Sequence, residues 1–150
     1  MSGVGNNEFS PNSSLTVAQA LQLVKKVYNL PDAEYNNEFS DVSVDAWYAQ
    51  AVASVNAAGL LPTEIISNGN LNPEGVMSRE AFAKIIMSGK KAEKQLSYQD
   101  ADSISEWAKN AVAAALEKGY MVGDDSGNFN PKKSLTRAEA ATVMLKIAAE

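Results

Sequence analysis

The stretch FNPKKSLTRAEA at residues 129–140 decides the fold, because two altered copies of it occur upstream. The first copy reads FSPNSSLTVAQA over residues 9–20, and the second reads LNPEGVMSREAF over residues 71–82. Self-similarity at a period of about 60 residues is typical of repeat architectures, in which each copy forms one supersecondary unit. The sequence therefore predicts three related units.

Each copy leads into a segment with helical periodicity. Apolar residues recur at positions i, i+3, i+4 and i+7 of all three segments, which is the spacing of one buried helix face. These residues are Ala20, Leu23, Val24 and Val27 in the first segment, Phe82, Ile85, Ile86 and Gly89 in the second, and Ala140, Val143, Met144 and Ile147 in the third. We therefore expect helices at about 16–28, 78–88 and 136–149.

A second recurring unit lies between these helices. Residues 39–42 (FSDV) precede Trp47, and residues 98–101 (YQDA) precede Trp107. The apolar residues that follow keep a helical register, which predicts two further helices. Their expected bounds are about 46–58 and 105–118, with Asp45 and Ser105 as N-caps and with Gly59 and Gly119 in left-handed conformations at the C-terminal ends.

These segments predict an all-α fold with little or no sheet, built from three helix–loop–helix pseudo-repeats within a single domain over residues 1–150. The first repeat is partial, because no Asp and Trp segment precedes it, and covers residues 9–30. The complete second and third repeats cover residues 39–89 and 98–149, and the polar residues 88–95 are expected to form a solvated linker or a frayed helix end.

Composition excludes several classes of function. The net charge of −5 argues against nucleic acid as a partner, because binding to phosphates needs a clustered excess of Lys and Arg. The chain has no Cys and no His, so thiolate chemistry and the commonest general base and metal ligand are missing. No apolar run is long enough to insert into a membrane, and the first residues lack the pattern of a signal peptide. We therefore expect neither an enzyme nor a cofactor.

Two arginines occupy the same place in the repeat. Thr136 with Glu139, and Thr16 with Gln19, have the spacing of a capping box, which satisfies backbone donors at a helix start. Capping does not explain Arg79 and Arg137, because the helix dipole disfavours a cation in the first turn. A bound anion would favour them, since helix amides and a guanidinium fork together suit a carboxylate. The alternative is that each arginine is exposed to solvent or paired with a nearby aspartate.

An aspartate and a tryptophan also recur together, as Asp41 with Trp47 and as Asp100 with Trp107. The apolar face of a sugar stacks on an aromatic ring while carboxylates and guanidinium groups take its polar groups, so Asp, Trp and Arg suit an acidic glycan. Each tryptophan can equally be a core residue, and each aspartate can equally close an Asx-turn.

The acidic loop at residues 124–128 (DDSGN) is expected to be a tight turn. It lacks the bidentate Glu that ends an EF-hand calcium loop. No metal site is therefore expected in this chain.

The ordered, repeated set of motifs from Phe9 to Ala149 resembles the S-layer homology family. The resemblance implies a three-pronged spindle around a central three-helix bundle and a secreted, non-catalytic module at the bacterial cell surface. It also implies that grooves between the prongs bind secondary cell-wall polysaccharide through a terminal pyruvylated sugar. The implied glycan-binding residues are Arg79, Arg137, Asp41, Asp100, Trp47, Trp107, Gly59 and Gly119.

The three copies depart from the family pattern in different ways. Val17 stands where the other copies have Arg79 and Arg137, so the groove of the first copy is expected to be inactive or differently used. Glu80 directly follows Arg79, so the second copy loses the acid of the capping box. A second chain or a further segment would be needed to complete the spindle. These departures keep open an alternative function, a structural or protein–protein assembly module that has lost glycan binding.

Overall fold

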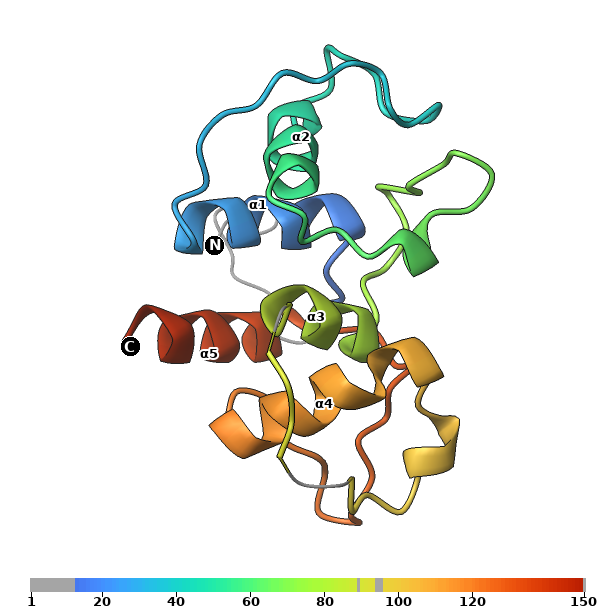
Figure 1. Cartoon of the computed structure of the whole chain (residues 1–150), viewed down its shortest axis with the longest axis vertical. Coiled ribbons are helices and arrows are strands. Elements are labelled where there is room, and N and C mark those ends of the chain that lie inside the picture. Colours follow the sequence, from blue (N-terminus) through green and yellow to red (C-terminus); the bar gives the residue numbers. More distant parts are fainter. Residues whose placement is uncertain (1–12, 89, 94–95, 150) are drawn as a thin grey trace.

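The computed structural model describes residues 13–88, 90–93 and 96–149, and these residues form an all-α fold (Figure 1). Its helices are α1 (Val17–Val27), α2 (Ala49–Ala57), α3 (Arg79–Ile86), α4 (Glu106–Lys118) and α5 (Arg137–Ala148), with short 3-10 helices η1 (Thr63–Ile65) and η2 (Ala101–Ser103). All five predicted helices are confirmed, and the only β-structure in the described part is isolated bridges. Residues 9–12 of the first copy and Gly89 lie outside the described residues.

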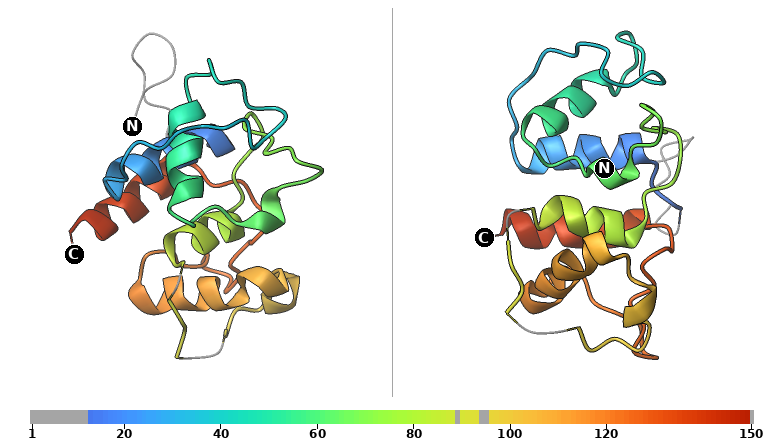
Figure 2. Two further views of the ribbon diagram at one scale, coloured as in Figure 1. Left: turned by 45° about the horizontal axis from the view of Figure 1, so that its top comes forward. Right: turned by 45° about the vertical axis from the view of Figure 1, so that its right-hand side comes forward.

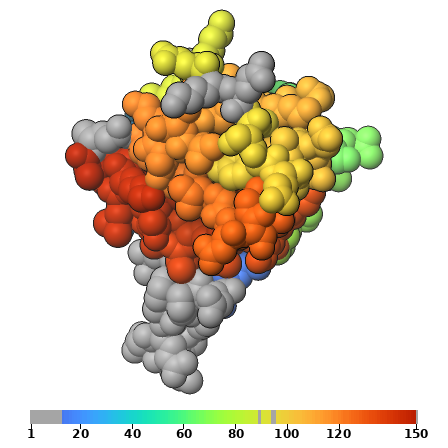
Figure 3. All heavy atoms as spheres, turned by 90° about the horizontal axis from the view of Figure 1, so that it is seen from below, coloured from blue at the N-terminus to red at the C-terminus, as the bar shows by residue number. Residues whose placement is uncertain are grey.

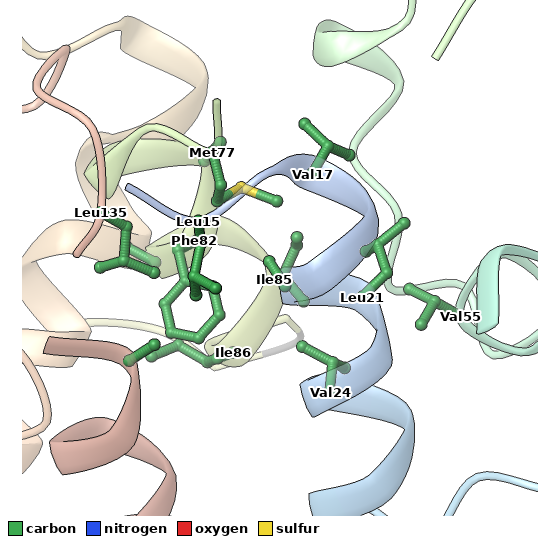
Figure 4. Close-up of a cluster of buried hydrophobic side chains, with 14 of the residues drawn as sticks. Leu15, Val17, Leu21, Val24, Val55, Met77, Phe82, Ile85, Ile86 and Leu135 are labelled. Atoms are coloured by element: carbon green, nitrogen blue, oxygen red, sulfur yellow. The ribbon is translucent and has the colours of Figure 1, made fainter. Parts of the chain in front are cut away.

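The three sequence copies meet in a closed ring of backbone hydrogen bonds. The amide of Leu15 donates to the carbonyl of Leu135 at 2.9 Å, Leu135 donates to Met77 at 2.7 Å, and Met77 donates to Leu15 at 2.9 Å. These residues hold the same place in the three copies, and at most 1% of each is exposed. Figure 4 shows their side chains beside Phe82 in a cluster of buried hydrophobic residues. The sequence repeat is therefore also a repeat of structure where α1, α3 and α5 begin.

Neighbouring copies also satisfy the first amide groups of the three central helices. The amide of Val17 donates to the carbonyl of Gly75 at 2.8 Å, that of Arg79 to Lys133 at 3.0 Å, and that of Arg137 to Ser13 at 2.9 Å. The third amide of each helix donates to the hydroxyl of its own N-cap, which is Thr16, Ser78 or Thr136. Both predicted capping boxes are confirmed, with Gln19 and Glu139 as their second members.

The other two helices form an arm on each side of this centre. Helix α2 packs on α1 and α4 packs on α3, so α2 and α4 lie at opposite ends of the molecule with α1, α3 and α5 between them (Figures 1 and 2). In Figure 4 Val55 of α2 lies beside Leu21 of α1, and both are fully buried. Two arms are present in the described residues, and the three-pronged spindle stays a prediction.

Glycine ends both arm helices for a conformational reason. Gly59 has a φ of +75° and Gly119 a φ of +74°, a left-handed backbone that disfavours any residue with a Cβ. A Cβ built on either glycine would meet nothing within 4 Å. Both predicted C-terminal glycines are confirmed, and their backbone conformation accounts for them.

The predicted N-caps of the arm helices need correction. Asp45 is wrong, because α2 begins after Tyr48, which makes no side-chain capping bond. Ser105 is the N-cap of α4, but its hydroxyl donates outward to Glu80 Oε2 at 2.6 Å. Glu80 also accepts the Ser105 amide at 2.9 Å and Lys132 Nζ at 2.8 Å. The second copy thus has Ala81 at the capping-box position, and Glu80, one residue before it, instead accepts hydrogen bonds at the start of α4.

Glu80→Ala is expected to lower the free energy of unfolding by about 2 kcal/mol, because Glu80 is buried and its loss strands the donors of Ser105. Urea unfolding followed by circular dichroism measures the change. Glu106→Ala is the matched control, since that side chain is 87% exposed and its removal should cost about 0.5 kcal/mol or less. Equal unfolding midpoints for both variants would rule out the proposed role of Glu80.

Candidate functional site in two repeated grooves

The first groove brings together two predicted binding residues from different repeats. It has a volume of about 580 Å³ and is named the Trp47 groove. Its lining residues are Leu15, Gln19, Gln22, Leu23, Lys26, Trp47 and Arg137. Trp47 belongs to the segment between α1 and α2, and Arg137 is the first residue of α5. The groove therefore combines the second and third repeats across a face of α1.

Trp47 is exposed and oriented by its neighbour. It is 60% exposed, while the adjacent Tyr48 is buried. The two rings meet edge to face, with centroids 5.1 Å apart and planes at 89°. This contact holds the indole at the groove and leaves most of it open to solvent, as a stacking surface for an apolar ligand face requires.

The charge of the Trp47 groove is positive. Arg137 is only 3% exposed and lies at the groove with Lys26. Gln19 and Gln22 supply neutral amides, and none of the described lining residues is acidic. A buried guanidinium beside amides and an exposed indole suits a ligand with a carboxylate, hydroxyl groups and an apolar face.

A second groove has the same arrangement, an arginine of one repeat against a helix face of another, on α5. It has a volume of about 230 Å³ and is named the Glu139 groove. Its lining residues are Arg79, Tyr120, Met121, Val122, Ala138, Glu139, Thr142, Val143 and Lys146. Figure 3 shows the face of the molecule on which α4 and α5 both reach the surface. Arg79 of α3 lies against the α5 face as Arg137 of α5 lies against the α1 face.

Arg79 is fully engaged inside the protein. Its Nε donates to the carbonyl of Phe129 at 2.9 Å, its Nη2 donates to the carbonyl of Val122 at 2.8 Å, and its Nη1 pairs with Glu139. The guanidinium also lies 4.7 Å from the centre of the Phe129 ring. Burial lowers the pKa of Arg79, and Tyr98 and two aspartates oppose this effect. Arg79 therefore links α3 to the third repeat, and an internal carboxylate occupies its outer side.

The two predicted aspartates hold loops of their own repeats. The Asp41 carboxylate accepts the amides of Leu71 and Asn72 at 2.9 and 2.7 Å. The Asp100 carboxylate accepts the corresponding pair, Phe129 and Asn130, both at 2.8 Å. These partners lie about 30 residues downstream, so the Asx-turn interpretation is wrong. Each aspartate instead anchors the turn that leads into the next central helix.

The remaining predicted residues are placed apart from the two grooves. Trp107 is the second residue of α4 and packs partly buried against the core. Gly59 and Gly119 line neither groove, although Lys146 at the Glu139 groove donates to the carbonyl of Gly119 at 2.6 Å. Trp47 and Trp107 are therefore equivalent in sequence and different in surroundings.

The expected contribution of helix amides to anion binding needs correction. The first amides of α3 and α5 already donate to Lys133 and Ser13, and the third amides donate to their N-caps. A ligand carboxylate in either groove would meet the arginine side chain, not these helix amides.

Sequence reasoning missed the α1 side of the Trp47 groove. Gln19, Gln22, Leu23 and Lys26 recur at i, i+3, i+4 and i+7. This stripe lies one residue before the apolar stripe of α1, and α5 repeats it at Glu139, Thr142, Val143 and Lys146. The missed signal was thus a second periodic stripe beside the one that predicted the core.

The acidic loop forms the tight turn that the sequence predicts. Asp124 Oδ1 accepts the amides of Ser126 and Asn128, and the Asp124 amide donates to the Asn128 carbonyl at 2.8 Å. Hydrogen bonds from the Asn130 side chain and then from the Asn128 amide hold the pKa of Asp124 below its usual value. Across the described ranges, no cluster of three acidic side chains suited to a metal ion occurs. The same ranges contain no helix with the length and apolar character needed to cross a membrane.

Comparison with known proteins agrees with this repeat structure. Residues 97–141 match the S-layer homology domain family. The chain is 34% identical over 95% of its length to the exoglucanase XynX of Acetivibrio thermocellus, of which it covers 14%. It is 31% identical to an amylopullulanase of Thermoanaerobacterium thermosulfurigenes and 29% identical to an S-layer protein of Bacillus thuringiensis subsp. finitimus, again over 95% of its length.

The chain spans less than one fifth of each of these relatives, with 8% of the amylopullulanase and 18% of the S-layer protein covered. The surface-layer relatives agree with the predicted location at the bacterial cell surface. The family match in the third repeat, the alignment over nearly the whole chain and the repeated central segments confirm the resemblance, and residues 97–141 match the S-layer homology domain family.

Proposed function

We propose that this chain is a non-catalytic module that anchors a protein to the bacterial cell wall by binding an acidic secondary wall polysaccharide in the Trp47 groove. The observation that carries the proposal is the groove itself, in which a buried arginine, a lysine and an exposed indole meet. The family match and the surface-layer relatives support the same role.

The residues of the groove divide the recognition of a pyruvylated terminal sugar among them. Arg137 and Lys26 attract the ketal carboxylate, and the guanidinium offers paired donors that match its two oxygens. Trp47 takes the apolar face of a sugar ring, and the amides of Gln19 and Gln22 reach toward hydroxyl groups. Asp41 and Asp100 act indirectly by holding the loops of the repeats.

Binding to purified wall polysaccharide, before and after chemical removal of its pyruvate, tests this function. We expect retention of the chain on the native polysaccharide and a loss of about tenfold or more without pyruvate, because the charge-assisted bonds to Arg137 would be missing. Negligible retention on both forms would refute glycan binding, and equal strong retention would refute the role of the carboxylate.

Trp47→Ala is expected to weaken polysaccharide binding by about tenfold without lowering stability, because the indole is exposed and its stacking contributes about 1 kcal/mol or more. Trp107→Ala is the matched control and should lower the melting temperature while leaving the affinity of the folded protein unchanged. Affinity electrophoresis and thermal unfolding measure the two effects. Equal losses of affinity in the two variants would contradict the assignment of stacking to Trp47 and of a core role to Trp107.

A protein-assembly function is the second candidate, and the outer face of α5 favours it. Leu145 of α5 is 72% exposed, whereas Met87, at the equivalent position after α3, is 2% exposed. Helix α4 covers that side of α3, while Leu145 of α5 faces solvent. A second chain or further segment that supplied an arm helix could pack here. Light scattering without glycan distinguishes this function, because an assembly module would oligomerise and a monomeric anchor would not.

A further inference from the structure

We infer that the Glu139 groove is a second anion groove that the protein closes with its own carboxylate, and that the residue at position 19 or 139 determines which groove accepts an acidic sugar. This inference rests on the proposed function of the Trp47 groove. It assigns different ligand preferences to two grooves that share one frame.

The two grooves align residue by residue. A shift of 120 residues superimposes the α1 stripe on the α5 stripe in sequence, and each stripe faces the arginine of another repeat. The matching pairs are Gln19 with Glu139, Gln22 with Thr142, Leu23 with Val143 and Lys26 with Lys146. Three of the pairs keep their charge and approximate polarity, and the first exchanges a neutral amide for a carboxylate. The groove arginines, Arg137 and Arg79, are also equivalent in the repeat.

The Glu139 carboxylate occupies the outer side of its arginine. One oxygen pairs with Arg79 Nη1, and the other accepts the Thr136 amide at 2.9 Å in the capping box. The capping box therefore holds the carboxylate in place at low entropic cost. With 36% of its side chain exposed, Glu139 lies at the groove surface, where an incoming anion would meet it. A ligand carboxylate would have to displace a like charge that is already bonded on both oxygens.

Gln19 makes the same capping bond without the charge. Its Oε1 accepts the Thr16 amide at 3.0 Å, so the helix start is built as in α5. An amide cannot neutralise the facing guanidinium as a carboxylate does. Along the two aligned stripes, the grooves thus differ by one charge, at the position of Gln19 and Glu139.

The remaining pairing of copies, the first copy's helix start with the stripe of α3, has neither the arginine nor the carboxylate. In the first copy Val17 replaces the arginine, and in the second copy Ala81 stands at the position of Gln19 and Glu139. That combination offers no arginine for an acidic sugar and no carboxylate at the position that closes the Glu139 groove. The three copies therefore give one groove that accepts an anion, one groove that its own carboxylate closes, and one pairing without either charge.

Calorimetry with a methyl hexoside that carries a pyruvate ketal tests the inference, with amide NMR shifts locating each site. Wild type is expected to bind one equivalent, with shifts at Gln22 and Lys26. Glu139→Gln should bind two equivalents, with new shifts at Val122 and Thr142, because Gln19 shows that an amide preserves the capping box. Gln19→Glu should weaken binding in the Trp47 groove at least tenfold. Glu106→Gln, at an exposed position, is the control and should change neither site.

The outcomes separate this inference from the proposed function. One equivalent for both wild type and a folded Glu139→Gln would overturn the inference and leave the Trp47 groove established. Two equivalents for wild type would also overturn it, because the Glu139 groove would then be open. No binding to wild type with a new site in Glu139→Gln would support the closure by Glu139 and refute glycan binding in the Trp47 groove. Gln19→Glu tests the same rule if Glu139→Gln does not fold, and unchanged affinity there would overturn it.

Discussion

Arg137→Ala is expected to weaken binding of the pyruvylated wall polysaccharide by about 100-fold, which is the largest effect on binding that we anticipate. Arg137 is the buried cation of the Trp47 groove, and truncating one partner of a desolvated charge pair costs about 2–5 kcal/mol of binding free energy. Isothermal titration calorimetry with the purified polysaccharide measures the loss.

Two matched variants control for the charge and for the fold. Lys133→Ala removes an exposed cation a few residues before α5 and should change affinity by less than about twofold. Arg137→Lys keeps the charge and loses the planar fork, so it should recover only part of the affinity. Circular dichroism confirms that each variant is folded. An Arg137→Ala chain that is folded and binds like wild type would refute the assigned role of Arg137.

Arg79→Ala is expected to lower the free energy of unfolding by about 3 kcal/mol, because it breaks a buried polar network. The carbonyls of Phe129 and Val122 would lose their donors, and Glu139 would lose its partner. The partial exposure of Glu139 keeps the expected cost below that of a fully buried pair. Urea unfolding measures the change.

Arg79→Lys should not restore this stability, since an ammonium cannot reach two carbonyls and a carboxylate in the geometry of the guanidinium. Polysaccharide binding measured below the unfolding transition should stay close to wild type. The opposite pattern, unchanged stability with lost binding, would make Arg79 a ligand-binding residue and refute its structural role.

The contrast between the two arginines shows how far sequence reasoning reached. Both were predicted from an unfavourable helix position, which indicated that each needs an anionic or polar partner. For Arg79 the partner is Glu139, which is 60 residues away in the chain. The two alternatives that the sequence offered, an arginine exposed to solvent and an arginine paired with a nearby aspartate, are therefore both wrong for Arg79. The sequence could not distinguish an internal partner from a ligand, because the distance along the chain says nothing about which side chains meet.

The aspartates and tryptophans also show what the sequence could and could not predict. Their recurrence correctly indicated repeated roles for Asp41 and Asp100, which bond equivalent amides in their two repeats. The tryptophans recur equally well in sequence, yet Trp47 lies exposed in a groove and Trp107 packs against the core. Side-chain exposure depends on what neighbouring elements cover, and the second and third repeats have different neighbours.

The sequence by itself determined the helices, their capping boxes and their terminal glycines, because these depend on a 3.6-residue period and on contacts within one turn. Only the tertiary structure decided that Trp47 and Arg137 share a groove and that Glu139 pairs with Arg79 in the other one. The physical reason is that each groove is assembled from different repeats around the ring of Leu15, Met77 and Leu135. Identical local motifs therefore acquire different charge and exposure from the partners that the ring places beside them.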